Sequence, residues 1–144
     1  MLIDDNEIDN LINQKIIESC NLCEYIFTHT SAKSAIEFLR NIERVSKWSK
    51  EMLPEFIFLD IDMPNMNGID FRKIAKDVPI CIFITSHPEF AVESFDLDTL
   101  NFIVKPLKFD RFTKTVDRIR DYLELKQKAN LFEASLGGDV IYIK

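Results

Sequence analysis

Acidic residues directly follow two apolar runs of this sequence. Asp4 and Asp5 come after a short run near the start, and Asp60 and Asp62 lie in the block FIFLDID. Three carboxylates brought together repel one another, since two unit charges about 4 Å apart interact by roughly 4 kcal/mol at an effective dielectric constant near 20. A cation relieves this repulsion, and all-oxygen ligands suit Mg²⁺, which is commonly shared with phosphate oxygens. The acidic residues therefore predict a magnesium site, at which Asp60 could act as a nucleophile that forms an aspartyl phosphate.

Two other polar residues follow apolar runs later in the chain. Thr85 ends the run that begins at Ile80, and Lys105 follows the run 102–104. Gly68 is the only glycine before the C-terminal tail, so no glycine-rich loop is present to bind phosphate. Singly, each of these residues has an ordinary structural interpretation, such as a helix cap, a strand former or a solvated charge. Together they favour a phosphate site built from a metal, Lys105 and the Thr85 hydroxyl group.

An alternation of strands and helices must position these residues. The run from Ile80 to Ile84 has no polar alternation, as expected of a strand in a sheet covered on both faces. Parallel strands need right-handed crossover connections, so five strand–helix units predict an α/β fold with a doubly wound five-stranded parallel sheet. Ligands bind such sheets at the carboxyl ends of the strands, where the polar residues fall. The predicted strands are 2–3, 25–28, 56–59, 80–84 and 102–104.

The predicted helices lie between and after these strands. Ser31 suits the N-cap of the second helix, and Pro88 suits the first turn of a short helix that runs to Phe95. Residues 43–55 are interpreted as a helix end and a connector. The first helix has apolar residues at 8, 11, 12 and 16, and the third spans 69–76. The last helix has a stripe that we assign to the core: Phe109, Phe112, Val116, Ile119 and Leu123.

The composition is that of one globular domain. The chain has 144 residues, of which 47% are hydrophobic and 29% charged, and this length is sufficient for a domain with its own core. No apolar run approaches the roughly 20 residues that span a membrane, and the acidic start does not resemble a signal peptide. We therefore expect a cytoplasmic protein. The net charge of −6 argues against direct contact with nucleic acid.

The cysteine and histidine residues have weaker claims to chemistry. Three cysteines are too few and odd in number for a disulfide framework. Cys20 and Cys23 form a CxxC near His29, but zinc needs four ligands and the chain has no second pair. The CxxC also falls at the C-terminal end of a predicted helix, where a redox thiolate is not stabilised. The dipeptide Ser86-His87 lacks the G-x-S-x-G elbow of a hydrolase, so His87 more plausibly belongs to the loop before the next helix.

Four blocks of the sequence together resemble the receiver domain of two-component response regulators. In chain order they are LIDDNE, LDIDMPNMNG, FITS and FIVKP, and the resemblance covers about residues 1–125. The family has a flavodoxin-like fold with strand order 2-1-3-4-5. The resemblance implies this fold, and a domain that catalyses its own Mg²⁺-dependent phosphorylation and dephosphorylation and changes conformation to control an output.

The resemblance also implies a role for each acidic residue. Asp60 would accept a phosphoryl group from the phosphohistidine of a kinase. Asp5 and Asp60 would bind Mg²⁺ directly, and Asp4 would act mainly through water. The backbone carbonyl of Asp62 would complete the protein ligands.

The remaining positions of the family pattern are also present. Lys105 would pair with the phosphoryl group, Thr85 would donate a hydrogen bond to it, and Phe102 would turn inward on activation. Gly68 would close the turn after Asp60. One departure is that only three residues precede Asp4, so the first strand is unusually short or the native N-terminus is trimmed.

Two other functional interpretations fit parts of this sequence. A haloacid-dehalogenase-type phosphatase matches FIFLDIDM loosely, with Asp60 as nucleophile and Asp62 as acid/base. Its acidic metal pair follows the lysine, whereas Asp4 and Asp5 come first here, and Met63-Pro64 replaces the expected threonine. Chain order therefore disfavours the phosphatase. A docking module that keeps the receiver fold without binding phosphate is also compatible with the sequence. Binding of a phosphoryl analogue would distinguish a phosphoacceptor from such a module.

The output and the partners are implied only in outline. The stretch FAVESFDLDTLNFIVKPLKFDRF resembles receivers attached to LytTR-type DNA-binding domains. Gly137-Gly138 predicts a turn and 140–143 a strand. We therefore divide the chain into a receiver domain (1–126) and a linker with the first strand of an output domain beyond residue 144 (127–144); a stand-alone receiver is the competing interpretation. The expected partners are a sensor histidine kinase or phosphotransfer protein, and a second copy bound through the fourth helix, fifth strand and fifth helix.

Overall fold

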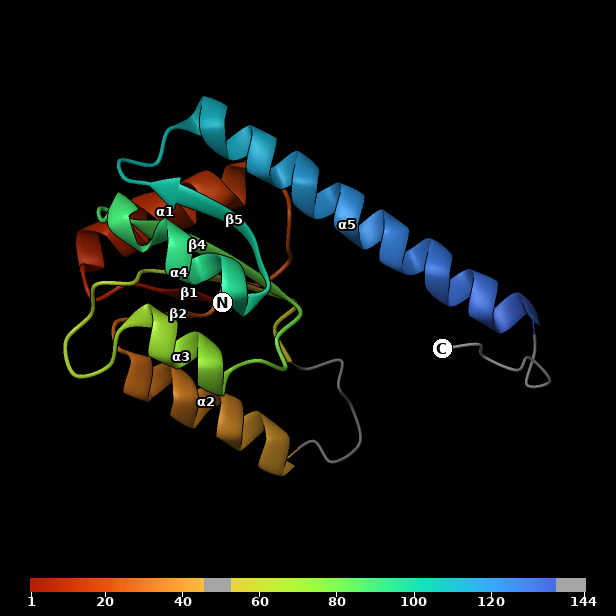
Figure 1. Ribbon diagram of the computed structural model, residues 1–144, viewed down its shortest axis with the longest axis horizontal. Helices are drawn as coiled ribbons and strands as arrows, with labels where there is room; N and C mark the ends of the chain where they lie inside the picture. Colours follow the sequence, from red (N-terminus) through yellow and green to blue (C-terminus); the bar gives the residue numbers. More distant parts are fainter. Residues whose placement is uncertain (46–52, 137–144) are drawn as a thin grey trace.

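The computed structural model describes residues 1–45 and 53–136. Within this part of the chain, five parallel strands form one sheet in the order β2-β1-β3-β4-β5 (Figure 1). The predicted doubly wound α/β fold and its strand order are therefore confirmed. The strands are β1 (Leu2–Ile3), β2 (Thr28–His29), β3 (Phe56–Leu59), β4 (Ile80–Thr85) and β5 (Thr99–Val104). The helices are α1 (Glu7–Ser19), α2 (Ala32–Val45), α3 (Gly68–Ile74), α4 (Ala91–Ser94) and α5 (Phe109–Leu136), with 3-10 turns at η2 (Pro88–Phe90) and η3 (Phe95–Leu97).

Helices cover both faces of the sheet, because successive residues of a strand point to opposite faces. In β3, Phe56 and Phe58 pack with residues of α1 and α5, whereas Ile57 and Leu59 pack with residues of α2 and α3. All six residues of β4 are buried, which accounts for its lack of polar alternation. The two hydrophobic clusters hold the carboxyl ends of the strands in fixed positions, and these ends carry the polar residues.

Two strands differ from their predicted bounds by more than one residue. β2 pairs with β1 at Thr28 and His29, so it begins and ends later than the predicted strand at 25–28. The reason is that β1 offers only two residues for pairing. β5 begins at Thr99 rather than at 102, and its register against β4 is irregular between Cys81 and Ile82. An irregular register interrupts the two-residue periodicity by which a strand is predicted.

The shorter helices follow the predicted segments with small shifts. α3 ends at Ile74, two residues before the predicted end. The predicted short helix from Pro88 to Phe95 is found as η2, α4 and the beginning of η3, and Pro88 does occupy its first turn. Ser31 accepts a hydrogen bond from the Ser34 amide group at the start of α2, as an N-cap does. The predicted connector at 43–55 lies largely outside the described residues.

Of the four apolar residues that predicted α1, only Ile16 packs against the core, and it is half-buried. The buried face includes Asn10 and Ile17 instead. The Asn10 side chain donates hydrogen bonds to the backbone carbonyls of Asp4 (2.8 Å) and His29 (3.1 Å), so this polar residue links the ends of β1 and β2. The exposed apolar residues are Ile8 (69% exposed), Leu11 (57%) and Ile12 (49%).

α5 runs well beyond the body of the domain (Figure 1). Phe112, Val116 and Ile119 are buried as predicted, but Phe109 is 52% exposed, so the buried stripe begins one turn later than expected. The helix is continuous through the predicted boundary at residue 126 and ends at Leu136. The predicted strand at 140–143 lies outside the described residues. None of the described helices is both long enough and apolar enough to span a membrane.

Candidate functional site

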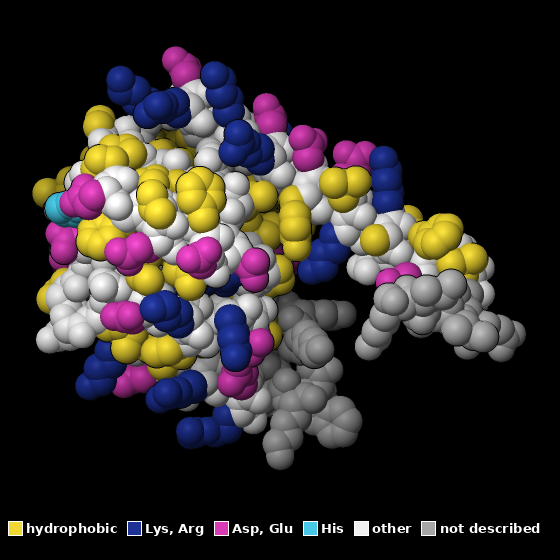
Figure 2. Space-filling model, in the orientation of Figure 1, with side chains coloured by type: hydrophobic (Ala, Val, Ile, Leu, Met, Phe, Trp, Pro, Cys, Tyr) yellow, Lys and Arg dark blue, Asp and Glu magenta, His cyan; other side chains and the backbone are white. Residues whose placement is uncertain are grey.

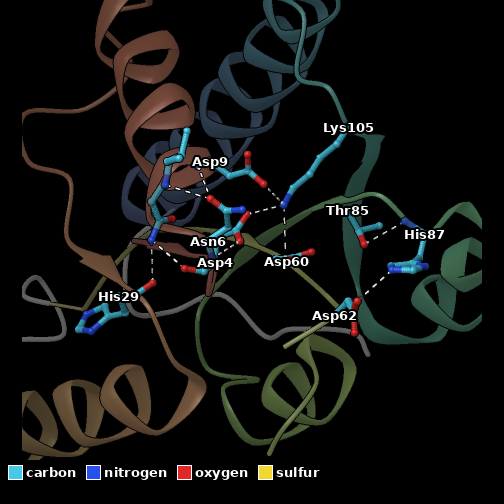
Figure 3. Close-up of polar contacts among 11 residues, drawn as sticks. Asp4, Asn6, Asp9, His29, Asp60, Asp62, Thr85, His87 and Lys105 are labelled. Carbon is cyan, nitrogen blue, oxygen red and sulfur yellow. Dashed lines mark hydrogen bonds and ion pairs between the residues drawn. The ribbon is translucent and has the colours of Figure 1, made fainter. Parts of the chain in front are cut away.

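The polar residues predicted from the strand ends lie together at one edge of the sheet. Figure 3 shows Asp60 between Asp4 on one side and Thr85 on the other, with Lys105 reaching over them. Carboxylate oxygens of Asp4, Asp5 and Asp60 all lie within 4.8 Å of one another. The structure therefore brings together the carboxylates that the sequence predicted to share a cation.

Lys105 joins three carboxylates in this cluster. Its ammonium group lies 2.6 Å from Asp4, 2.9 Å from Asp9 and 3.6 Å from Asp60. Burial alone would lower the pKa of Lys105, but its hydrogen bonds to Asp4 and Asp9 and the charge of Asp60 raise this pKa above the usual value. The amine is therefore a permanent positive charge at the site.

Asp9 is a site residue that the sequence analysis missed. It lies in the first turn of α1, where its amide group is capped by the Asn6 side chain. Its carboxylate is partly exposed and accepts a hydrogen bond from Lys105. A signal was present in the sequence, since the first turn of a helix that follows a strand lies at the same edge as the strand end. An acidic residue five positions after Asp4 can therefore reach the same lysine.

Asp60 is buried, with 5% of its surface accessible. Among the acidic residues of the site, only Asp4 is more deeply buried. Burial raises the pKa of the Asp60 carboxyl group to about 7, and the negative charge of Asp4 acts in the same direction. Lys105 opposes this shift only in part. A buried carboxylate with like charges beside it favours a bound cation, so the site fits a divalent metal such as Mg²⁺.

The two adjacent acidic residues differ in how they are held. Asp4 is buried, and its two oxygens accept hydrogen bonds from the Asn6 amide group (3.0 Å) and from Lys105 (2.6 Å). Asp5 is exposed and makes no hydrogen bond or ion pair to the rest of the described chain. Asp5 therefore has both oxygens available to a metal, whereas those of Asp4 already have protein partners.

A second polar group connects the loops on the other side of Asp60 (Figure 3). The His87 ring lies 3.0 Å from the carboxylates of both Asp62 and Glu89. These hydrogen bonds, that of Glu89 first, raise the pKa of His87 above its usual value. The His87 amide group donates to the Thr85 hydroxyl group at 3.2 Å. His87 thus links the loop after β3 to the loop after β4, next to Thr85.

Gly68 sits where a side chain does not fit. Its amide group donates to the Ile61 carbonyl at 2.8 Å, which folds the loop back toward Asp60. A Cβ atom at this position would lie 2.9 Å from the Ile61 Cα and would collide with the Asp60 carbonyl. The predicted role of Gly68 in closing the turn after Asp60 is consistent with this packing.

Phe102, the predicted switch residue, lies on β5 beside the core. It is half-buried, and its ring centroid is 6.3 Å from that of Phe83 on β4. Phe102 and Thr85 thus belong to neighbouring strands, as the predicted coupling between them requires.

A large, mostly apolar cavity lies elsewhere in the described chain. About 690 Å³ of space is lined by residues at the amino ends of β1 and β3, among them Met1 and Phe56, and by Cys23. This is the opposite edge of the sheet from Asp60. Cys20 and Cys23 are both free thiols, and they follow the C-terminal end of α1 as predicted. The chemistry of the site therefore depends on its charged side chains and not on a deep pocket.

Comparison with known proteins identifies the family of this arrangement. The family model of the response regulator receiver domain matches residues 1–117. Transcriptional regulatory protein NatR of Bacillus subtilis is 31% identical over 134 residues, which cover 90% of this chain and 52% of NatR. Sensory transduction protein LytT of the same species is 27% identical over 113 residues, covering 74% of this chain and 47% of LytT. The chain thus spans about half the length of the curated relatives it matches.

Solved structures show the same fold. A two-component response regulator from Cytophaga hutchinsonii superposes with a TM-score of 0.67 at 25% identity, covering 83% of this chain and 94% of that one. Response regulator TrrA from Thermotoga maritima, solved in complex with Mg²⁺ and beryllofluoride, has a TM-score of 0.61 at 17% identity, covering 81% and 94%.

Proposed function

Because this chain belongs to the response regulator receiver family, we propose that it accepts a phosphoryl group on Asp60 and changes shape in response. The observation that carries the proposal is the convergence of Asp60, two further carboxylates, a hydroxyl group and Lys105 at one edge of the sheet. A sensor histidine kinase or a phosphotransfer protein would be the phosphodonor.

The metal site follows from how the carboxylates are held. Asp5 and Asp60 would bind Mg²⁺ directly, the Asp62 backbone carbonyl would be a third protein ligand, and Asp4 would act mainly through water. The partners that Asp4 already has, Asn6 and Lys105, support this division. When bound, Mg²⁺ supplies charge that offsets the phosphate oxygens and the clustered carboxylates. Asp60 would then be held ionised, as a nucleophile must be.

The bonds that change in the transfer lie on Asp60 and on the donor histidine. A carboxylate oxygen of Asp60 forms a bond to phosphorus as the nitrogen–phosphorus bond of the donor histidine breaks, and the electron pair of that bond stays on the histidine. Lys105 would pair with the transferred phosphoryl group, and Thr85 would donate a hydrogen bond to it. Attack by water on the same phosphorus later releases phosphate and restores Asp60.

The switch would use Thr85 and Phe102. When the Thr85 hydroxyl group turns toward the phosphoryl group, space is vacated beside it, and Phe102 on the adjacent strand can fill that space. The surface formed by α4, β5 and α5 would then change shape. Val92 and Phe95 on this surface are each 78% exposed, which supports its use in binding a second copy.

The longer protein would couple this switch to transcription. The names of NatR and LytT refer to regulation and sensory transduction, and the chain spans about half of each. We propose a DNA-binding output domain beyond residue 144 and a cytoplasmic location. The receiver itself, with a net charge of −6, would not contact DNA. A phosphatase remains disfavoured, since the metal carboxylates precede Lys105 in the chain.

Labelling with a small phosphodonor tests the proposal. Acetyl phosphate with Mg²⁺ should add one phosphoryl group to the chain, detected by intact-mass analysis. Asp60→Asn should abolish the addition, whereas Asp62→Asn, in the same loop but 71% exposed at its side chain, should retain it. Equal labelling of Asp60→Asn would show that the nucleophile is misassigned. A wild-type chain that is neither labelled nor bound by beryllofluoride would support the phosphate-independent docking module.

A further inference from the structure

The end of α5 is a helix that, after its first few residues, lies away from the rest of the described chain. Residues 120–136 are exposed except Leu123, which is half-buried. Figure 1 shows this segment leaving the body, and Figure 2 shows apolar side chains along it. We call this segment the α5 extension. An isolated helix of this length is marginally stable in water, and exposed leucine and phenylalanine side chains add no stability until they are covered. Contact with a partner surface that buries these side chains would therefore stabilise the extension.

The apolar residues of the extension follow a heptad pattern. Successive members of the stripe are separated by three, four, three and four residues, which is the a/d spacing of a coiled coil. Its first residue, Tyr122, still lines a hollow of the body with Thr99 and Leu100, whereas every residue from Leu125 to Leu136 is exposed. Its residues are Tyr122, Leu125, Ala129, Phe132 and Leu136, of which Leu125 and Phe132 are 68% and 64% exposed.

The charged residues beside the stripe indicate which partner covers it. With Tyr122 at position a, Asp121 and Lys128 occupy g positions, and Lys126 and Glu133 occupy e positions. In a parallel pair of identical helices, each g residue faces the e residue five positions later on the other helix. Asp121 would then face Lys126 of the second copy, and Lys128 would face Glu133 of the second copy. Both pairs have opposite charges.

We propose that the α5 extension forms a parallel two-stranded coiled coil with a second copy of this chain. Lys128 already lies 3.4 Å from Glu124 within its own helix, and as a g residue it is placed to contact the second helix as well. This interface is separate from the α4–β5–α5 surface and does not depend on phosphorylation. Asp60→Asn should therefore leave it unchanged, so the coiled coil and the phosphoacceptor role can fail independently.

Sedimentation equilibrium of the full chain without phosphodonor tests the interface. The wild type should dimerise, and Leu125→Asp should raise the dissociation constant at least about tenfold, the loss expected from removing one packed d residue. Leu131→Asp is the matched control, because Leu131 is 63% exposed but lies off the stripe. A wild type that stays monomeric at its highest soluble concentration would overturn the proposal, as would equal weakening by the two substitutions. Circular dichroism would check that each variant remains folded.

Charge exchange tests the partner more specifically. Lys128→Glu and Glu133→Lys should each dimerise less than the wild type, because each places like charges at the g and e positions. Mixing the two variants should restore dimers, since each mixed pair again has opposite charges. Failure of the mixture to associate better than either variant alone would contradict the charge pairing.

The orientation of the helices has its own test. In a chain with Cys20 and Cys23 replaced by serine, Ala129→Cys should form an interchain disulfide under mild oxidation, because equivalent a residues meet in a parallel pair. Asn130→Cys, one residue away on the outer face, should not. Cross-linking at 130 and not at 129 would overturn the parallel arrangement.

Discussion

The ammonium group of Lys105 lies closer to Asp9 than to Asp60, at 2.9 Å against 3.6 Å. A lysine that is to pair with a phosphoryl group on Asp60 is therefore shared with a carboxylate of α1. The negative charge of Asp9 would also face the incoming phosphoryl group. Asp9 should accordingly lower the level of phosphorylation that the chain reaches.

Asp9→Asn should raise the steady-state fraction of phosphorylated chain at a fixed, subsaturating concentration of acetyl phosphate. Removal of one partly screened carboxylate near Lys105 is worth on the order of 1 kcal/mol, or about fivefold in the ratio of phosphorylated to free chain. Intact-mass analysis measures this ratio. Glu7→Gln is the control, because Glu7 lies in the same turn but its side chain has no hydrogen bond or ion pair within the described chain. Equal increases in both variants would indicate a general charge effect rather than the contact with Lys105.

Alanine substitutions of Asp4 and Asp5 should affect different properties, the first mainly stability and the second mainly Mg²⁺ binding. Asp5→Ala should weaken Mg²⁺ binding more, by about tenfold or greater, because it removes a direct ligand. Asp4→Ala should lower the free energy of unfolding more, by about 1–3 kcal/mol, because Asn6 and Lys105 lose a buried acceptor. Calorimetric titration measures the first effect and urea denaturation the second. If the two variants bind Mg²⁺ equally weakly, the proposed division between direct and water-mediated ligands is wrong.

The metal-free chain should lose stability as Asp60 ionises. The pKa of Asp60 is raised to about 7 by burial and by Asp4, whereas an unfolded aspartate titrates near 3.9. The folded chain thus holds a proton that the unfolded chain releases, so the free energy of unfolding falls as pH rises from about 4 to 7, by on the order of 2–4 kcal/mol.

Asp60→Asn isolates this contribution from the other groups that titrate in the same range. In the presence of EDTA, the variant should be more stable than the wild type at pH 8, and the difference should shrink at pH 5. Saturating Mg²⁺ should narrow the gap at pH 8, because only the wild type gains a full ligand set. Urea denaturation at the two pH values provides the measurement. A constant difference across this range would contradict the raised pKa.

The Thr85 hydroxyl group should be required for the switch. Beryllofluoride should change hydrogen-exchange protection across residues 86–110 in the wild type, and much less in Thr85→Ala. Thr85→Ser is the matched control, because it keeps the hydroxyl group that accepts from the His87 amide group. An undiminished response in Thr85→Ala would refute the coupling between Thr85 and Phe102 without affecting the assignment of Asp60.

Sequence patterns predicted the sheet well because its strands are short and separated by helices, and because β1, β3 and β4 are fully buried. Ile80–Ile84 has no polar residue, and its neighbours end on polar groups at one edge. β2 was harder to place, because its bounds depend on the two residues that β1 offers for pairing. The buried face of α1 escaped prediction, since Asn10 is buried through hydrogen bonds to two backbone carbonyls, which apolar periodicity does not register.

The residues of the site likewise divide into those that the sequence predicted and one that it did not. The positions predicted correctly lie at or just after the carboxyl ends of strands: Asp4, Asp5, Asp60, Thr85 and Lys105. Asp9 was missed because it belongs to a helix, and its part in the site depends on where the Lys105 side chain reaches. The position of Asp9 in the first helical turn after β1 indicated the correct edge of the sheet, but the contact with Lys105 is seen only in the structure.

Because α5 is one continuous helix, it can transmit a rotation of the body to its far end as a rigid rod. An α-helix rises about 1.5 Å per residue, so the segment from the last buried residue, Ile119, to Leu136 measures roughly 25 Å. A tilt of the helix by about 10° at the body would displace its far end by about 4 Å over that length. A small movement beside Asp60 that tilts α5 would thus become a larger displacement at Leu136. The stiffness of the helix would determine how much of that displacement is transmitted to its far end.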